Sequence, residues 1–411
     1  MACGQCGLAV LSLCNFKKQG NCHVMKNWYA SFATIVLNTF IAASLFLVVL
    51  WAALELRHVF TGKGSVVIST SILYESFGLT PADRAKATAK EFDNYASDQP
   101  FVFNPWTTFM LAPVQGENLN VVNDPLLNHR LSKPVTKKEN ERDKLVIWGF
   151  GGSTLYGFGV PDDQTIPSHL QQILAQQYPG KSIEVMNFGQ PYWFSSVEVA
   201  AYMALLRSGR KPDIVFFLDG LNDMANLVPG REVPFFTSQA SNAWERERSN
   251  ARRLLPWMTV NESFPVTRVM RYIESKFPKA PVASNRFDNL KNMDSKAVMQ
   301  VFMNNLKTVT ALSKEFGVKP LFFLQPVPWY GDYQAPSVIK NSFPFGELKV
   351  AKTVYGKIVS EYANLTGATA LHNVLYDSKW PFVDTYHYSD TGNKILAENI
   401  ARAIKQKIDT D

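Results

Sequence analysis

The chain has 411 residues, 46% of them hydrophobic and 19% charged, and this balance excludes an intrinsically disordered protein. A formal net charge of +7 indicates a mildly basic surface. The basic residues form no cluster interleaved with aromatic side chains, so we expect no nucleic-acid partner. The length allows one large domain or two modest ones.

The cysteines all lie close to the start of the chain, so the long remainder folds without disulfide bonds. They are Cys3, Cys6, Cys14 and Cys22. Together with His23 they could ligate zinc or carry acyl chains beside a membrane, but their spacing matches no zinc motif well. An unstructured tail with free thiols is the favoured interpretation of residues 1–28. We expect no metal and no cofactor.

Residues 29–54 carry no charge and form a run long enough to cross a hydrocarbon core of about 30 Å. Trp28, Tyr29 and Trp51 near its ends suit the membrane interfaces. The run is too long for the apolar core of a cleaved signal peptide, and a buried helix of a soluble protein is the alternative. The sequence therefore predicts one transmembrane helix over 29–54.

The flanking charges predict the orientation of this helix. Three lysines precede it (Lys17, Lys18 and Lys26), whereas Arg57 and Lys63 follow it together with Glu55. The positive-inside rule then favours a cytoplasmic N-terminus and an extracytoplasmic C-terminal domain, periplasmic or at the cell surface.

We expect residues 55–142 to form a stalk and lead-in segment. A helix is predicted from Thr80 to Phe92, because Thr80 can cap it and Pro81 stands in its first turn. Prolines among aromatic residues follow over 100–113, a pattern that favours extended segments packed on the main domain over a loose linker.

From residue 143 to 411, apolar strands alternate with amphipathic helices, and an insertion at about 226–292 interrupts the rhythm. The predicted strands are 145–150, 183–187, 213–218, 320–324 and 368–372. The predicted helices are 166–178, 195–208, 297–316, 348–363 and 391–407. This alternation predicts an α/β fold with three α/β/α layers and a mostly parallel central sheet.

The turn Gly151-Gly152-Ser153-Thr154 follows the first of these strands and presents one hydroxyl. It is no dinucleotide loop, because Thr154 stands where the third glycine belongs, and no phosphate-binding loop, because Gly-Lys-Ser/Thr is missing. It also lacks the second glycine of a nucleophile elbow, where Leu155 stands. Taken alone, Ser153 is more often a turn or cap residue than a nucleophile.

Three further features stand at the ends of later elements. Gly189 follows the second strand, and a glycine there lets a backbone N–H approach a ligand closely. Asn222 follows the third strand, where its amide could donate to an oxyanion or merely form a turn. Asp384 and His387 precede the last helix at a spacing that lets the carboxylate orient the imidazole.

Together, these features in this order resemble the SGNH (GDSL-like) hydrolase superfamily over about 145–407. The resemblance implies a nucleophile at Ser153, a general base at His387 oriented by Asp384, and an oxyanion hole made by Gly189, Asn222 and the Ser153 amide. Gly152 replaces the acidic residue of the Gly-Asp-Ser form. That variant, followed by Tyr-Gly-x-Gly-Val, is similar to membrane-anchored bacterial members.

The resemblance implies a membrane-anchored serine esterase acting on an acylated glycan or lipid of the cell envelope. The alternatives are an O-acyltransferase, a non-catalytic glycan-binding assembly protein and a nucleotide-binding α/β domain. Aromatic residues in predicted loops could stack on sugar rings, although ordinary packing is favoured for each. They are Trp193, Trp244, Trp257, Trp329 and Tyr330.

Overall fold

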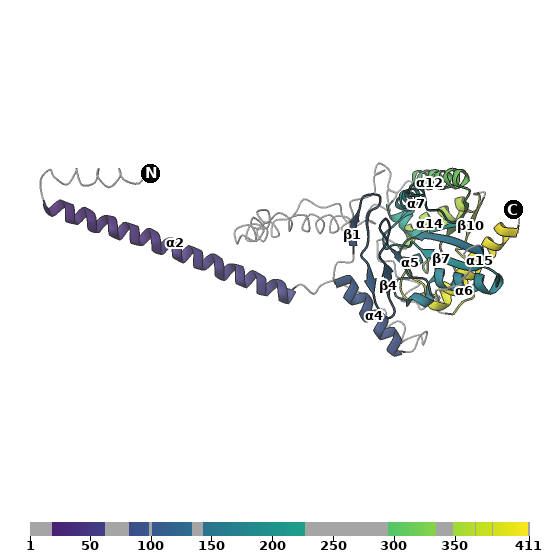
Figure 1. The fold of residues 1–411 in the computed structure, drawn as a ribbon, viewed down its shortest axis with the longest axis horizontal. Helices are drawn as coiled ribbons and strands as arrows, with labels where there is room; N and C mark the ends of the chain where they lie inside the picture. The colour runs from purple at the N-terminus through teal and green to yellow at the C-terminus, as the bar shows by residue number, and fades with distance from the viewer. Residues whose placement is uncertain are drawn as a thin grey trace. The chain divides into compact units, whose positions relative to one another are not determined.

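The computed structural model describes residues 19–61, 82–97, 101–133, 143–226, 295–333, 348–365, 367–379 and 381–409 (Figure 1). The chain divides into two compact units. One is Met1–Gly64 with Arg252–Ala280, and the other is Ser65–Ala251 with Pro281–Asp411.

The first unit contains the long helix α2, Gln19–Thr61. Within it, Trp28–Leu50 is a stretch of 23 residues that is apolar and long enough to cross a membrane. The large apolar side chains of this stretch are exposed, Phe40 at 71% for example, and are not packed in a protein core. The N-terminal tail with Cys3, Cys6 and Cys14 lies outside the described residues.

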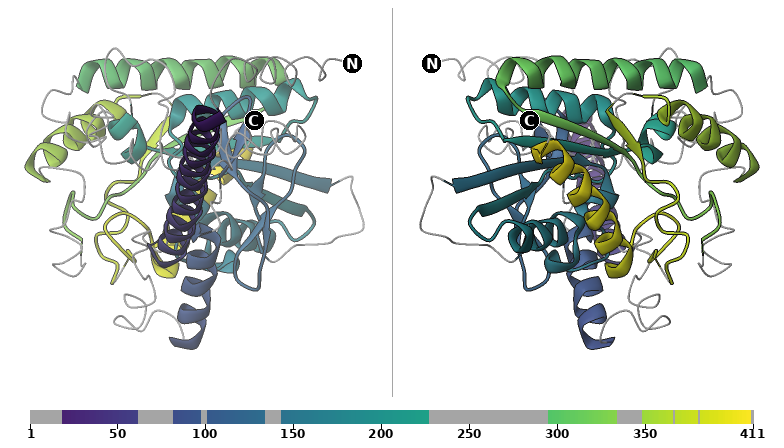
Figure 2. Two further views of the ribbon diagram at one scale, coloured as in Figure 1. Left: turned by 90° about the vertical axis from the view of Figure 1, so that its left-hand side faces the viewer. Right: turned by 90° about the vertical axis from the view of Figure 1, so that its right-hand side faces the viewer.

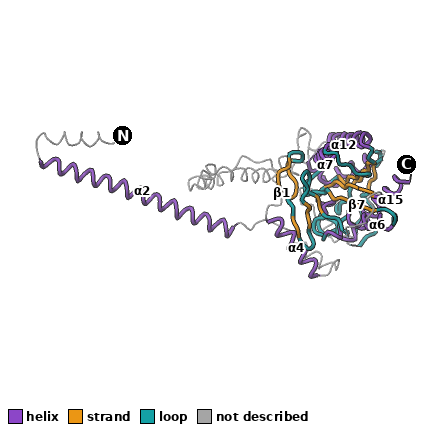
Figure 3. The backbone as a smooth tube through the Cα atoms, viewed as in Figure 1, coloured by secondary structure: helices purple, strands orange, loops and turns teal. Residues whose placement is uncertain are grey.

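The second unit is built on a sheet of eight strands in the order β10-β9-β8-β6-β7-β5-β4-β3. Figure 3 draws the strands in orange and the helices in purple. The five strands at one side are parallel: β6 (Lys144–Gly151), β7 (Ser182–Asn187), β8 (Ile214–Asp219), β9 (Lys319–Leu324) and β10 (Ala368–Ala370). The other three are antiparallel: β3 (Val114–Gln115), β4 (Asn120–Val122) and β5 (His129–Arg130). A separate hairpin pairs β1 (Phe101–Asn104) with β2 (Thr108–Leu111).

Helices cover both faces of the sheet (Figure 2). One face is covered by α7 (Ser195–Arg207), α12 (Ser295–Phe316) and α14 (Leu348–Tyr362), and the other by α6 (Ile166–Gln177) and α15 (Asp390–Asp409). All six residues of β8 are buried, and successive side chains point to opposite faces. A strand buried on both faces needs a continuous apolar run. This is why the apolar residues of β8 show neither the spacing of a helix nor the alternation of a half-exposed strand.

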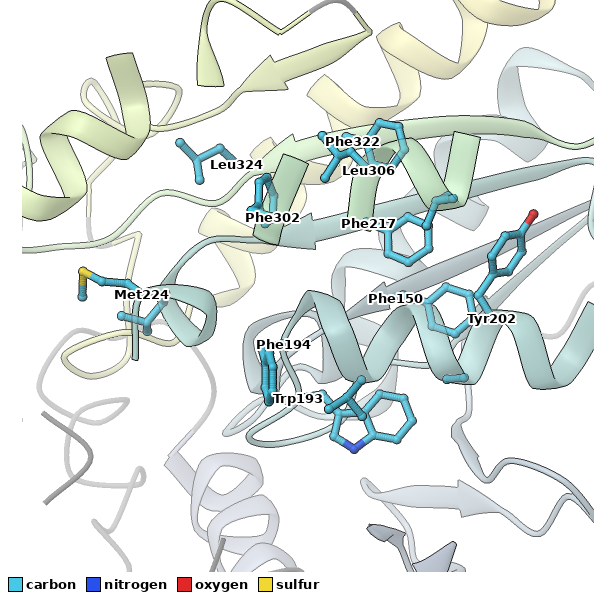
Figure 4. Close-up of a cluster of buried hydrophobic side chains, with 14 of the residues drawn as sticks. Phe150, Trp193, Phe194, Tyr202, Phe217, Met224, Phe302, Leu306, Phe322 and Leu324 are labelled. Atoms are coloured by element: carbon cyan, nitrogen blue, oxygen red, sulfur yellow. The ribbon is translucent and has the colours of Figure 1, made fainter. Parts of the chain in front are cut away.

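Aromatic side chains fill the core on the α7 side of the sheet (Figure 4). The Phe150 ring stacks on those of Phe188 and Phe217, with centroids 5.2 Å away in each case. Trp193 is fully buried, and its indole N–H donates to the carbonyl of Phe109 at 3.2 Å. The loop after β7 is thereby tied to β2.

The predicted α/β class with a mostly parallel sheet is confirmed, and the main strands and helices agree with the predicted ranges to within a few residues. The helix predicted from Thr80 to Phe92 appears as α4, Ala82–Ser97. The strand predicted over 368–372 is shorter in the structure. The predicted insertion at 226–292 falls almost wholly outside the described residues, and α8 (Leu221–Asn226) leads up to it.

The lead-in, predicted as extended segments packed on the main domain, also contributes strands to the central sheet. Three of its strands belong to the central sheet, because Arg130 of β5 pairs with Asn187 of β7. Strands of two or three residues are too short to show a hydrophobic period, so their membership of the sheet was not readable from the pattern.

Candidate active site

The residues singled out in the sequence gather at the carboxyl ends of the parallel strands. Ser153 follows β6, Gly189 follows β7, and Asn222 follows β8. Asp384 and His387 lie in the loop before α15. Chain reversals between parallel strands bring all such ends to one edge of the sheet, which is where α/β folds bind ligands.

Ser153, His387 and Asp384 form a continuous hydrogen-bonded chain. The Ser153 hydroxyl lies 2.8 Å from Nε2 of His387, although the two residues are 234 positions apart in the sequence. Nδ1 of the same ring lies 2.6 Å from Oδ2 of Asp384. With Nδ1 protonated toward Asp384, Nε2 can accept the serine proton.

The Asp384 carboxylate is held by its own loop. Its Oδ1 accepts the backbone N–H groups of Tyr386 at 2.9 Å and His387 at 2.7 Å. Burial by itself raises the pKa of this carboxyl, but the charge of His387 and the hydrogen bonds from His387 and Tyr386 outweigh burial, so the net pKa is lowered. Asp384 therefore stays ionised at neutral pH while it orients the imidazole.

Ser153 begins α5, a single helical turn of four residues, Ser153–Tyr156. Gly152 precedes it in an extended conformation. A Cβ atom at Gly152 would lie 2.4 Å from Nδ2 of Asn222. The glycine found where the Gly-Asp-Ser form has an acidic residue therefore gives Asn222 room to lie against the nucleophile turn.

The predicted oxyanion donors are already engaged in this structure. Nδ2 of Asn222 donates to the carbonyl of Trp193 at 2.7 Å. The N–H of Gly189 donates to Oδ1 of Asn187 at 3.0 Å. To hold an oxyanion, each residue would have to share or exchange its present acceptor. The role of both residues stays a prediction.

Aromatic rings line the site around the histidine. The His387 ring lies 4.8 Å from the ring of Phe158 and 4.4 Å from that of Tyr386. Tyr192, in the loop that carries Gly189, is 40% exposed and lies 6.1 Å from the Phe101 ring. Its φ of 70° is unusual for a residue other than glycine, and such strain persists where the surroundings impose it.

The aromatic residues proposed for sugar stacking are mostly packing residues. Trp193 and Trp329 are buried at 0% and 1% exposure, so neither offers a face to a ligand. Tyr330 is partly buried and packs on the Tyr355 ring at 5.4 Å. Trp244 and Trp257 lie outside the described residues. Tyr192, which the sequence did not single out, is the exposed aromatic side chain of the site.

A buried group of carboxyls lies under the turn that carries Asn222. Glu198 of α7, Asp219 at the end of β8 and Asp223 of α8 are all buried. Burial and mutual repulsion raise the pKa values of Glu198 and Asp219 well above the ordinary range. Burial also raises the pKa of Asp223, although hydrogen bonds from Ser195 and Gly220 oppose the shift. Burial therefore favours the protonated, neutral form of these carboxyls.

Within the described part of the chain, no cluster of three His, Cys, Asp or Glu side chains is arranged to hold a metal ion. What the site can do with its own side chains is proton transfer and nucleophilic attack by an activated serine.

The decisive observation is that Ser153, Gly189, Asn222 and the Asp384–His387 pair share one edge of a parallel sheet in this chain order, with the serine, histidine and aspartate in contact. This is the arrangement that the resemblance to the SGNH hydrolases implied. No family model and no curated protein sequence matches the chain.

The solved structures similar to the chain include three named as esterases or lipases. The psychrotrophic esterase EstA from Pseudoalteromonas sp. is 12% identical, with 64% of this chain and 98% of that chain covered and a TM-score of 0.33. The acetyl xylan esterase AlAXEase is 13% identical, with 63% and 100% covered and a TM-score of 0.33. The lipase/acylhydrolase from Enterococcus faecalis is 15% identical, with 64% and 96% covered and a TM-score of 0.34. Identities and TM-scores this low do not show which reaction this chain performs.

Proposed function

We propose that this protein is a serine ester hydrolase, anchored in a membrane by α2, that cleaves an acyl ester of a cell-envelope glycan or glycolipid. The observation that carries the proposal is the contact of the Ser153 hydroxyl with Nε2 of His387 at 2.8 Å, with Asp384 behind the ring. A serine hydroxyl is a weak nucleophile unless an adjacent base removes its proton.

In the first half of the reaction, Oγ of Ser153 attacks the ester carbonyl and its proton moves to Nε2 of His387. The carbonyl π electrons move to oxygen, and Asn222 with the Ser153 amide stabilises this oxyanion. The intermediate collapses, the carbon–oxygen bond to the alcohol breaks, and His387 gives its proton to the departing alkoxide. The products are the free alcohol and an acyl group on Ser153.

In the second half, His387 takes a proton from water, and the resulting hydroxide attacks the acyl carbonyl. The tetrahedral intermediate expels Oγ of Ser153, which recovers its proton from His387, and a carboxylic acid leaves. A sugar hydroxyl in place of water would yield a new ester. Hydrolase and O-acyltransferase therefore share every residue named and differ in the acceptor.

Two observations support the glycan and membrane parts of the proposal. The exposed Tyr192 offers an aromatic face beside the site, and sugar rings stack on such faces. Helix α2 has the length and composition to cross a membrane. The predicted orientation, with the N-terminus in the cytoplasm, would place the site on the side of the membrane where envelope glycans are found.

The test uses the full chain in detergent and a fluorophosphonate probe, which labels activated serines. We expect labelling of the wild type at Ser153, none in Ser153→Ala, and normal labelling in Ser208→Ala, a serine at the far end of α7. Acetyl and longer acyl esters should likewise be hydrolysed by the wild type and by Ser208→Ala, and not by Ser153→Ala. A wild type that stays unlabelled while still binding glycan would contradict the proposal and favour a non-catalytic assembly protein.

The acceptor is tested by adding glycan to the same ester assay. An esterase releases carboxylic acid at a rate equal to alcohol release, with or without glycan. Alcohol release that exceeds acid release, with acyl groups recovered on the glycan, would favour the O-acyltransferase.

A further inference from the structure

Arg130 of β5 is a fully buried arginine whose side chain takes no part in the proposed reaction. Its guanidinium donates to three backbone carbonyls: Tyr156 at 2.9 Å, Gly157 at 2.5 Å and Val160 at 2.6 Å. These carbonyls belong to the last residue of the helical turn that begins with Ser153, and to the segment directly after it. A planar guanidinium with five donors can satisfy several carbonyls at once, which an ammonium group on a flexible stem does poorly.

The segment that Arg130 holds also holds the nucleophile. The N–H groups of Gly157 and Phe158 both donate to the carbonyl of Ser153, at 3.1 and 3.0 Å. The turn Ser153–Tyr156 has four residues, and a helix of this length is not stable by itself. The position of Ser153 thus depends on the residues immediately beyond the turn, and Arg130 holds those residues by their carbonyls.

The same segment reaches the general base. The Phe158 ring lies 4.8 Å from the His387 ring. Since the Phe158 amide is bonded to Ser153 and its side chain packs on His387, a shift of this residue would move both partners of the Ser153–His387 contact. Arg130 therefore acts on the nucleophile and on the base through one short stretch of chain.

Arg130 is itself anchored by charge and by ring contacts. Its Nε lies 3.0 Å from Oδ1 of Asp162, and both side chains have no exposed surface. Asn120 of β4 donates to Asp162 through its backbone N–H at 3.2 Å and through Nδ2 at 2.7 Å. Lys133 lies 3.3 Å from the same carboxylate. The lead-in thus supplies the arginine and two of the groups that hold its counterion.

Local sequence around the turn is adapted to this arginine. Gly157 has a φ of 83°, in the left-handed region that favours glycine, and a Cβ there would lie 2.6 Å from Cγ2 of Thr165 and 3.2 Å from Nη1 of Arg130. The rings of Phe92 and Tyr156 lie 5.5 and 4.8 Å from the guanidinium carbon. The guanidinium is therefore enclosed by rings, carbonyls and one carboxylate.

We propose that Arg130 is a positioning residue for the nucleophile turn, and that the lead-in over 101–133 is therefore part of the catalytic unit and not a spacer. The inference rests on the proposed function of Ser153. It requires that loss of the guanidinium slow the chemical step while leaving substrate binding nearly unchanged, because Arg130 contacts backbone and not substrate.

The test compares Arg130→Met and Arg130→Lys with Arg84→Met in the full chain. Arg84 is a matched control, since it pairs with Asp163, the neighbour of Asp162, but is 38% exposed. We expect Arg130→Met to lower kcat for a small acetyl ester, and the rate of fluorophosphonate labelling, about 100-fold with KM within about threefold, as for a misplaced reacting group. The kcat and labelling rate of Arg130→Lys should lie between those of Arg130→Met and the wild type. Arg84→Met should match the wild type in both.

The variant Ile404→Ala distinguishes positioning by Arg130 from a general loss of stability. It opens a cavity near the C-terminal end of α15, where Ile404 is buried. This variant should lose thermal stability and keep kcat at temperatures where it is folded. Hydrogen exchange at the Gly157 and Phe158 amides should quicken in the Arg130 variants and stay unchanged in Ile404→Ala. An Arg130→Met protein that is folded and retains wild-type kcat and exchange would overturn the inference.

Should both Arg130 variants fail to fold, the variant Asn120→Ala tests the positioning role of Arg130 instead. It removes one hydrogen bond to Asp162, and we expect a loss of a few-fold in kcat with faster exchange at Gly157; wild-type values for both would overturn the inference. If the wild-type serine does not react with the probe, the proposed function fails, and the exchange measurements still show whether Arg130 holds the turn.

Discussion

The two sides of the Ser153 site differ in how complete they are. On the base side, Ser153, His387 and Asp384 are joined by bonds of 2.8 and 2.6 Å, and the aspartate is further held by two backbone N–H groups. On the oxyanion side, Asn222 is bonded to Trp193 and the Gly189 amide to Asn187. The base side is ready for proton transfer, while the oxyanion side is committed to internal acceptors.

In the proposed reaction, this difference would make the two sides of the site limit the rate in different ways. A preformed base would require no movement, so removing any of its parts should remove the chemistry itself. Oxyanion donors that already have acceptors would have to share or exchange them as negative charge develops on the substrate.

The largest effect is expected on the base side. Ser153→Ala and His387→Ala should each lower kcat by about 10⁴-fold or more, and the double variant should lose little further, because the two residues act as a unit. Circular dichroism and thermal unfolding should show a folded protein in each case. Additive losses in the double variant would mean that Ser153 and His387 do not act together.

The next effect concerns Asn222. Asn222→Ala should lower kcat about 100- to 1000-fold, the cost of one oxyanion donor, with KM nearly unchanged. Asn399→Ala, an asparagine within α15 that bonds to its own helix, is the control and should have no effect on activity. Wild-type activity in Asn222→Ala would show that the oxyanion is held by other groups.

A third prediction concerns the carboxyls beneath Asn222. Because the folded state raises the pKa of Glu198, it binds a proton that the unfolded chain releases above about pH 4, so the free energy of unfolding falls as pH rises. Glu198→Gln keeps the shape and removes this titration. The variant should melt at least about 2 °C above the wild type at pH 8, with a smaller gap at pH 5. A gap that is larger at pH 5 would contradict a raised pKa.

The smallest effect is expected from Tyr192. Tyr192→Ala should raise KM for a glycan ester a few-fold and leave a small acetyl ester unaffected, because the ring would contact the sugar and not the reacting atoms. Tyr192→Gly should show the same KM for the glycan ester as Tyr192→Ala. It should be more stable than Tyr192→Ala by about 1 kcal/mol, since glycine adopts a φ of 70° without strain. Equal KM values for the glycan ester in Tyr192→Ala and wild type would exclude stacking at this ring.

Most of the α/β core could be predicted because its elements are long and periodic. The β8 strand is a continuous apolar run, and helices such as α12 and α15 carry an apolar stripe that recurs every three to four residues. The positions of the site residues followed from chain order, since a residue directly after a parallel strand has to lie at the carboxyl edge.

What could not be predicted depends on contacts between distant segments. Arg130 stands on a two-residue strand, and nothing in its neighbourhood signals a buried ion pair with Asp162. Tyr192 shows its strain only in the backbone conformation. The occupation of the Gly189 amide by Asn187 depends on which way a side chain turns two residues earlier.

By itself, the sequence determined the apolar N-terminal helix and the layered fold, because hydrophobic periodicity is a local property. The candidate site residues were singled out by their positions at strand ends, and the resemblance to a known superfamily implied their roles. The tertiary structure decided that Ser153 and His387 are in contact, that the lead-in joins the sheet, and that Arg130 lies behind the nucleophile turn. Each of these results from packing between residues far apart in the chain, which a local pattern does not encode.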